Sequence, residues 1–190
     1  EFATPPTAAG ILTAVVTTTT ENSGAAVQVA TVIPKVIAST VNLAADATTI
    51  TINGSGFSTT AANNTVDFNN GAIGTVTAAT TQALTVTLST GPTTAGALTA
   101  QVTTNGISSG AAVQVAKVIP VITSSSANLD AGAATLTIDG FGFDPTAANN
   151  TVEFDGDAVG TITAATATSL TVSFSTSPNV AGDLLAIAST

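Results

Sequence analysis

The acidic side chains in the second half of the chain are the residues best suited to a chemical role. Their spacing places four of them in or beside two predicted loops that could converge: Asp144, Glu153, Asp155 and Asp157. Calcium takes about six to eight oxygen ligands, often from carboxylates and loop carbonyl groups. A calcium site is therefore one hypothesis for these loops. Solvated turn residues are the other, because Asp155-Gly156-Asp157 is a natural hairpin turn.

Catalysis is not expected from the remaining side chains. The chain has no His and no Cys, so the groups that most often titrate or attack near neutral pH are missing. Serine and threonine are abundant, but a hydroxyl nucleophile needs an activating base. Paired carboxylates can hydrolyse glycosides, yet neither Trp nor Tyr is present to form a sugar platform. We therefore expect a protein that is not an enzyme and uses no cofactor.

Charge and hydropathy exclude two further classes of partner. The formal net charge is -9, and the two cations, Lys35 and Lys117, are too far apart to form a phosphate-binding patch. No stretch approaches the length of apolar sequence that spans a bilayer. We expect neither nucleic-acid binding nor membrane insertion. The acidity, the scarcity of lysine and the abundance of threonine favour an extracellular, cell-surface location.

An internal repeat organises the chain. Val32-Ile33-Pro34 recurs as Val118-Ile119-Pro120, and Ala61–Val66 recurs as Ala147–Val152, both at an offset of 86 residues. Residues 1–30 match the last third of this unit. The predicted division is an N-terminal extension over 1–30, a first repeat over 31–116, and a second repeat over 117–190 that lacks its last strand.

The repeat also bears on the acidic loops. The positions equivalent to the four acidic residues of the second copy hold other side chains in the first: Ser58, Asp67, Asn69 and Gly71. A metal site required for folding should appear in both copies. The difference therefore favours turn residues over calcium ligands.

Within each unit the hydrophobic period is two residues, which indicates strands. Ile50-Thr51-Ile52 and Leu84–Leu88 alternate apolar and polar side chains, and Asn-Gly and Asp-Gly pairs separate such runs. Seven short strands per unit predict an all-β chain of tandem antiparallel sandwiches. In the first unit the strands are expected near 32–40, 48–53, 64–69, 73–79, 82–88, 96–104 and 107–116.

The sequence resembles the IPT/TIG family of immunoglobulin-like domains. The resemblance rests on Ile50–Phe57 and Thr65–Phe68 in the first copy, and on Ile138-Asp139-Gly140, Gly142-Phe143 and Val152–Phe154 in the second. It implies immunoglobulin-like sandwiches of the E-set type, acting as spacers or interaction modules of surface proteins. Independently of the resemblance, Gly56 suits a tight bend and Phe57 suits a sandwich core.

The two ends of the sequence match each other. The second copy lacks a counterpart of 105–116, whereas the N-terminal extension contains that sequence, with Ala25, Val27 and Val29 alternating as the inward side of a strand. An open sheet edge leaves backbone groups unpaired. We therefore expect strand complementation between copies of the chain, in which the extension of one chain fills the C-terminal unit of the next. Repeated head to tail, this contact would build a filament.

Apolar side chains at outward strand positions occur at the same two ends: Ile11, Val15, Leu185 and Ile187. Exposed apolar surface often marks an interface. The alternative is that the sequence is an excerpt of a larger array, either an adhesin or a glycan-binding accessory module. In that case the partners would include a glycan or a host surface, and the loops at 139–145 and 155–158 would carry the binding site.

Overall fold

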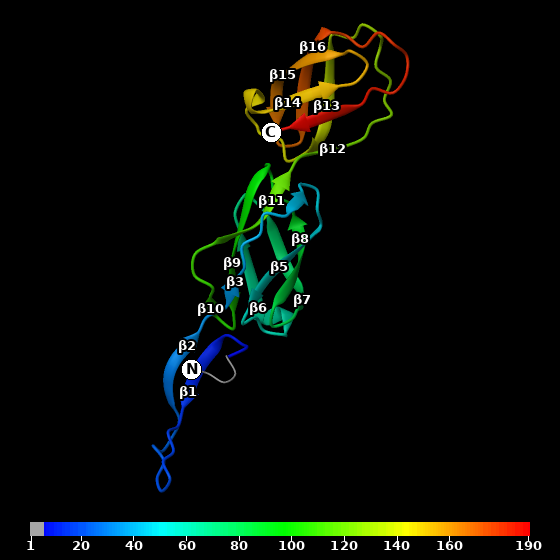
Figure 1. Ribbon diagram of the computed structural model, residues 1–190. Helices are drawn as coiled ribbons and strands as arrows, with labels where there is room; N and C mark the ends of the chain where they lie inside the picture. The colour runs from blue at the N-terminus through cyan, green and yellow to red at the C-terminus, as the bar shows by residue number, and fades with distance from the viewer. Residues whose placement is uncertain (1–5) are drawn as a thin grey trace.

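The computed structural model describes residues 6–190, and it is built from β-strands joined by turns. Three bodies follow one another along a rod (Figure 1): an N-terminal hairpin, a complete sandwich called unit 1, and a smaller sandwich called unit 2. The all-β architecture predicted from the two-residue period is confirmed. Residues 1–5 of the predicted extension lie outside the described part. No helix among residues 6–190 is long and apolar enough to cross a membrane.

Unit 1 consists of two packed sheets. One sheet has the order β3 (Lys35–Val36), β5 (Thr49–Ser55), β8 (Ala83–Thr90) and β7 (Ile73–Ala79). The other has the order β10 (Ile107–Ser108), β9 (Gly96–Thr104), β11 (Val113–Ile119) and β4 (Asn42–Ala44), with β6 (Asn64–Phe68) paired to β9. A single 3₁₀ turn, η1 (Ala61–Asn63), precedes β6.

The core of unit 1 lies between these sheets and follows the sequence alternation. Ile50 and Ile52 point inward from β5, while Leu98, Ala100 and Val102 point inward from β9. These inward residues are apolar, and threonine is frequent at the outward positions, such as Thr49 and Thr51 of β5, as expected for strands with one buried face.

A glycine and a phenylalanine close the core of each unit. Gly56 has a φ of 79°, a left-handed conformation that favours glycine, and Phe57 next to it is fully buried. The Phe57 ring packs on Gly54, where a Cβ would overlap both that ring and the Lys35 carbonyl oxygen. Phe143 packs on Gly140 in the same way in unit 2. The structural roles predicted for Gly56 and Phe57 are confirmed.

Unit 2 repeats the first sheet of unit 1 but only part of the second. Its larger sheet has the order β12 (Val121–Ile122), β13 (Thr135–Phe141), β16 (Ser169–Thr176) and β15 (Val159–Thr166). The facing sheet contains β14 (Thr151–Phe154), preceded by η2 (Ala147–Asn149), and β17 (Ala186–Ser189). The hydrophobic core of unit 2 contains four buried residues, against sixteen in unit 1. The partly covered residues of unit 2 therefore include apolar groups whose equivalents in unit 1 are buried.

The N-terminal hairpin pairs β1 (Gly10–Ala14) with β2 (Val27–Val32) in antiparallel fashion. β2 continues past residue 30, and β11 continues past residue 116 to Ile119. The predicted division at 30/31 and 116/117 therefore falls inside strands. The structure places the junctions at Pro34 and Pro120, because proline lacks the N–H that would continue a ladder.

Two predicted strands differ from the observed ones for the same kind of reason. The strand expected at 107–116 is divided into β10 and β11, because Gly110 takes a φ of 89° between them. The strand expected at 32–40 is reduced to β3, because Pro34 precedes it and residues 37–40 leave the sheet.

Substituting Gly54 with alanine should destabilise unit 1. The added Cβ meets a backbone oxygen and a buried ring that cannot both move away, so we expect a loss of about 1–3 kcal/mol. Gly10→Ala is the matched control, because nothing lies within 4 Å of a Cβ there, and its effect should stay within about 0.5 kcal/mol. Denaturant unfolding monitored by circular dichroism measures both. Equal midpoints for the two variants would contradict this account.

Candidate assembly interface

The junction between unit 1 and unit 2 is a short backbone contact. The Ala95 N–H donates to the Gly142 carbonyl oxygen at 2.9 Å, and Thr94 forms an isolated parallel bridge with Gly142. Gly142 has a φ of 78°, and a Cβ there would lie 2.6 Å from the Cβ of Ala45, which is itself buried. The junction therefore brings the backbones of two units into contact at a position where only glycine fits.

The junction between the hairpin and unit 1 has the same geometry. The Ala9 N–H donates to the Gly56 carbonyl oxygen at 2.8 Å, and Ala8 forms the isolated parallel bridge with Gly56. Ala9 is 4% exposed, and its carbonyl oxygen also accepts a hydrogen bond from Asn105 Nδ2 at 3.3 Å. Each contact is displaced by the repeat length of 86 residues. The hairpin therefore docks on unit 1 as unit 1 docks on unit 2.

The hairpin also reproduces an internal pairing of unit 1. Gly10 lies opposite Val32, and Leu12 opposite Ala30, just as Gly96 lies opposite Val118, and Leu98 opposite Ala116. Both ladders shift register at the same place. β1 and β2 are thus the structural equivalents of β9 and β11.

The β1–β2 pair and the β9–β11 pair differ in how exposed their equivalent side chains are. Val115 of β11 is 4% exposed, whereas its equivalent Val29 of β2 is 60% exposed. Val27 is 63% exposed, whereas Val113 is partly covered and packs against the core of unit 1. Ser23–Ala30 and Ser109–Ala116 have identical sequences. The hairpin therefore carries the inward face of a sandwich without a facing sheet among the described residues.

Unit 2 shows the complementary feature. In unit 1, β9 pairs with β6 on one edge and with β11 on the other, and β11 pairs in parallel with β4. In unit 2, β17 pairs with β14, and no strand of the described residues lies on its other edge. Residues 128–130 and 182–185, the equivalents of the two segments that flank β11, are not strands. Strand structure is therefore missing where the ladder partner is missing.

The predicted assembly residues are placed as follows. Val27 and Val29 lie on β2, whereas Ala25 precedes it. Sequence alternation missed Ala30: in unit 1 the bulge turns both Val115 and Ala116 into the core, so two consecutive residues are buried. The strict alternation expected for this strand is therefore wrong at this point, and nothing in the sequence other than its equivalence to Ala116 indicates the bulge.

The apolar side chains predicted at outward positions are exposed: Ile11, Val15, Leu185 and Ile187 are 46–68% accessible. The structure does not bring the two pairs together within one chain. β1 and β17 lie on opposite sides of unit 1 along the rod (Figure 1).

Asp144 of unit 2 stabilises its own loop through side-chain hydrogen bonds. Asp144 accepts hydrogen bonds from the Thr146 N–H at 2.7 Å and from Asn149 Nδ2 at 2.9 Å. The Ser58 hydroxyl of unit 1 accepts the equivalent bonds from Thr60 and Asn63. The carboxylate thus takes over the role of a hydroxyl in a turn present in both units.

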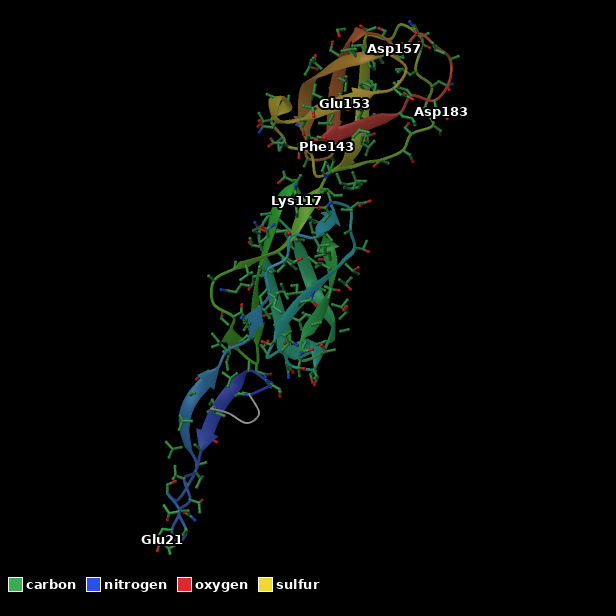
Figure 2. All side chains as sticks on the ribbon, in the orientation of Figure 1. Glu21, Lys117, Phe143, Glu153, Asp157 and Asp183 are labelled. Atoms are coloured by element: carbon green, nitrogen blue, oxygen red, sulfur yellow. The ribbon has the colours of Figure 1, made fainter. Side chains whose placement is uncertain are left out.

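The other acidic residues do not join Asp144. Asp155 Oδ1 accepts the Leu185 N–H at 2.8 Å, and Asp157 occupies a left-handed turn position with a φ of 62°. Figure 2 shows Glu153 on a strand in the middle of unit 2 and Asp157 at its far end. Within residues 6–190 no group of three acidic side chains is placed to hold a metal ion. The structure therefore does not assemble the calcium site considered from the sequence.

The hydrogen bonds at Asp144 favour its charged form. The bond from Asn149, followed by the bond from the Thr146 backbone, lowers the pKa of this carboxyl below its ordinary value of 3.8. A lowered folded-state pKa contributes stability that is fully present above the unfolded-state value. That contribution is lost as the pH falls through the folded-state value.

Replacing Asp144 with alanine should therefore reduce the stability of unit 2 at neutral pH. The difference from the unaltered chain should fade as the solution is acidified below about pH 4, where the carboxyl becomes protonated in the unfolded chain. Asp144→Ser is the matched control, because Ser58 performs this role in unit 1 without titrating. Thermal midpoints measured across this pH range test the prediction, and a pH-independent loss in Asp144→Ala would refute it.

Comparison with protein families gives one match. Residues 32–115 match the IPT/TIG domain, and this range runs from the end of β2 into β11, covering both sheets of unit 1. The resemblance noted for the second copy lies outside the matched range. A comparison with curated proteins gives no match. With its two-sheet sandwich and its buried Gly-Phe closure, unit 1 of this chain is an IPT/TIG immunoglobulin-like domain.

Proposed function

We propose that this chain is a non-enzymatic, extracellular structural protein. Its immunoglobulin-like units build a cell-surface filament or stalk, joined head to tail by strand complementation between copies. The observation that carries the proposal is the repeated junction. Equivalent hydrogen bonds to left-handed glycines, Gly56 and Gly142, link the hairpin to unit 1 and unit 1 to unit 2. A contact that recurs at a fixed repeat length propagates along an array.

The connections between units support a stiff rod. Only Pro120 separates β11 of unit 1 from β12 of unit 2, and Ile33-Pro34 separates β2 from β3. Proline restricts the backbone, and neither connection contains the glycine and serine that make linkers flexible. The backbone contact at Gly142 and the burial of Ala45 further restrict bending.

The surface chemistry supports a structural role. Threonine occupies outward positions of the strands, and the two units present few charges. Two of the acidic side chains considered for a site accept hydrogen bonds from the protein: Asp144 within its own turn, and Asp155 from the Leu185 N–H. Two features of the described residues are suited to contact another copy. One is the face of β2 that has no facing sheet, and the other is the edge of β17 that has no ladder partner.

Substituting Gly142 with alanine should loosen the rod. The new Cβ would meet Ala45, and the positive φ would be strained, so the junction between units should open. We expect electron micrographs to show a wider distribution of angles between units, and small-angle scattering to show a shorter maximum dimension.

Gly132→Ala is the matched control for that experiment. Gly132 has the same sign of φ, 80°, but a Cβ there meets nothing within 4 Å. Both variants bear the backbone strain, so only the junction contact distinguishes them. If both variants kept the same narrow angle distribution as the unaltered chain, the junction would not stiffen the rod and the proposed stalk would lose its main support.

A further inference from the structure

We propose that, during assembly, residues 182–189 of a second copy, which end in β17, replace β1 as the strand that pairs with β2. This inference rests on the proposed head-to-tail function and names the strand that is exchanged. β1 corresponds to the first half of β9, and residues 182–189, which end in β17, correspond to most of β9; β2 corresponds to β11, with which β9 pairs. In the single chain, β2 pairs with β1. In the assembly, β2 pairs with residues 182–186 of the neighbouring copy, which lead into its β17.

The sequences of the three equivalent strands support the exchange. Each segment carries leucine and then alanine at its inward positions: Leu12 and Ala14 in β1, Leu98 and Ala100 in β9, and Leu184, just before β17, with Ala186 at its start. The ladder of β11 on β9 therefore predicts the ladder of β2 on residues 182–186 of the neighbour, which would extend β17 toward the N-terminus. Val27 would lie opposite Ala186, Thr31 opposite Asp183, and Val32 opposite Gly182.

The exchange would bury surface that both partners leave uncovered. Val27 and Val29 are 63% and 60% exposed in the hairpin, whereas Val115 is 4% exposed in the complete sandwich. On the accepting side, residues 128–130 and 182–185 would gain the ladder partner that orders their equivalents in unit 1. Burial of apolar surface therefore favours the exchanged pairing over the hairpin.

The exchange would also continue the rod. Ala181 is the equivalent of Ala9 and Ala95, the residues whose N–H groups donate to the junction glycines. With β17 in the place of β1, Ala181 would reach Gly56 of the second copy. Unit 2 of one copy would then dock on unit 1 of the next through the junction already repeated within the chain.

Disulfide trapping tests the exchange directly, because the chain has no native cysteine. Thr31→Cys combined with Asp183→Cys places the two thiols opposite each other only when β2 of one copy pairs with residues 182–186 of another. Unit 1 lies between β2 and unit 2 within a single chain (Figure 1), and Asp183 belongs to unit 2 (Figure 2). Mild oxidation should produce a ladder of covalent oligomers under denaturing, non-reducing electrophoresis. Each single variant should give dimers at most.

The control pair keeps Thr31→Cys and moves the second cysteine to Ile11, its observed partner in the hairpin. This variant should close an internal disulfide, stay monomeric and fail to assemble, because β2 is then locked to β1. A Thr31/Asp183 variant that forms no ladder, while the Thr31/Ile11 variant closes normally, would overturn the exchange.

A third variant changes the competition without touching either sandwich. Ala14→Pro removes an N–H from β1, which lies outside units 1 and 2, and should weaken the hairpin. In the Thr31/Asp183 background the ladder should form several-fold faster. An unchanged or slower rate would show that β1 does not compete for β2. If stiff rods form in micrographs but no ladder is trapped, the exchange fails, and of the proposed function only the stiff rod of stacked units stands. If the ladder forms but micrographs show flexible chains, the exchange stands and the stiff rod of the proposed function fails.

Discussion

Backbone pairing on both edges of one strand is the constraint on which the rest of the structure depends. In unit 1, β11 lies between β9 and β4, so the N–H and C=O groups of three chain segments are satisfied together. In unit 2 the equivalents of both flanking segments, residues 128–130 and 182–185, do not form strands. Unit 1 thus has strands on both sides of β11, whereas the described residues of unit 2 have no strand between the two equivalent segments.

The same reasoning links the sandwich to the rod. β11 completes unit 1 and then runs directly into the junction at Pro120, so the strand that closes one unit also positions the next. The left-handed glycine at the junction allows two backbones to approach within hydrogen-bonding distance. Completion of a unit and its stacking on a neighbour are consequently parts of one structural arrangement.

Differences between the copies show which positions tolerate a change of chemistry. Ser58 and Asp144 differ in charge but accept hydrogen bonds from equivalent turn residues. The buried amide of Asn64 likewise has a counterpart in Asn150, which accepts from Asp144 N–H and donates to its carbonyl oxygen. Asp144 of unit 2 thus takes part in the hydrogen-bonding scheme in which Ser58 takes part in unit 1.

The sequence by itself determined the all-β class, the repeat of 86 residues and the roles of Gly56 and Phe57, because alternation, turn dipeptides and core side chains are local signals. It also showed that Ser23–Ala30 is identical in sequence to Ser109–Ala116, which leads into the last strand of unit 1. Only the tertiary structure decided where β11 ends, that a bulge buries Ala116, and that β1 pairs with β2. Those features depend on which distant segment supplies the other half of each hydrogen bond, and no local pattern specifies that choice.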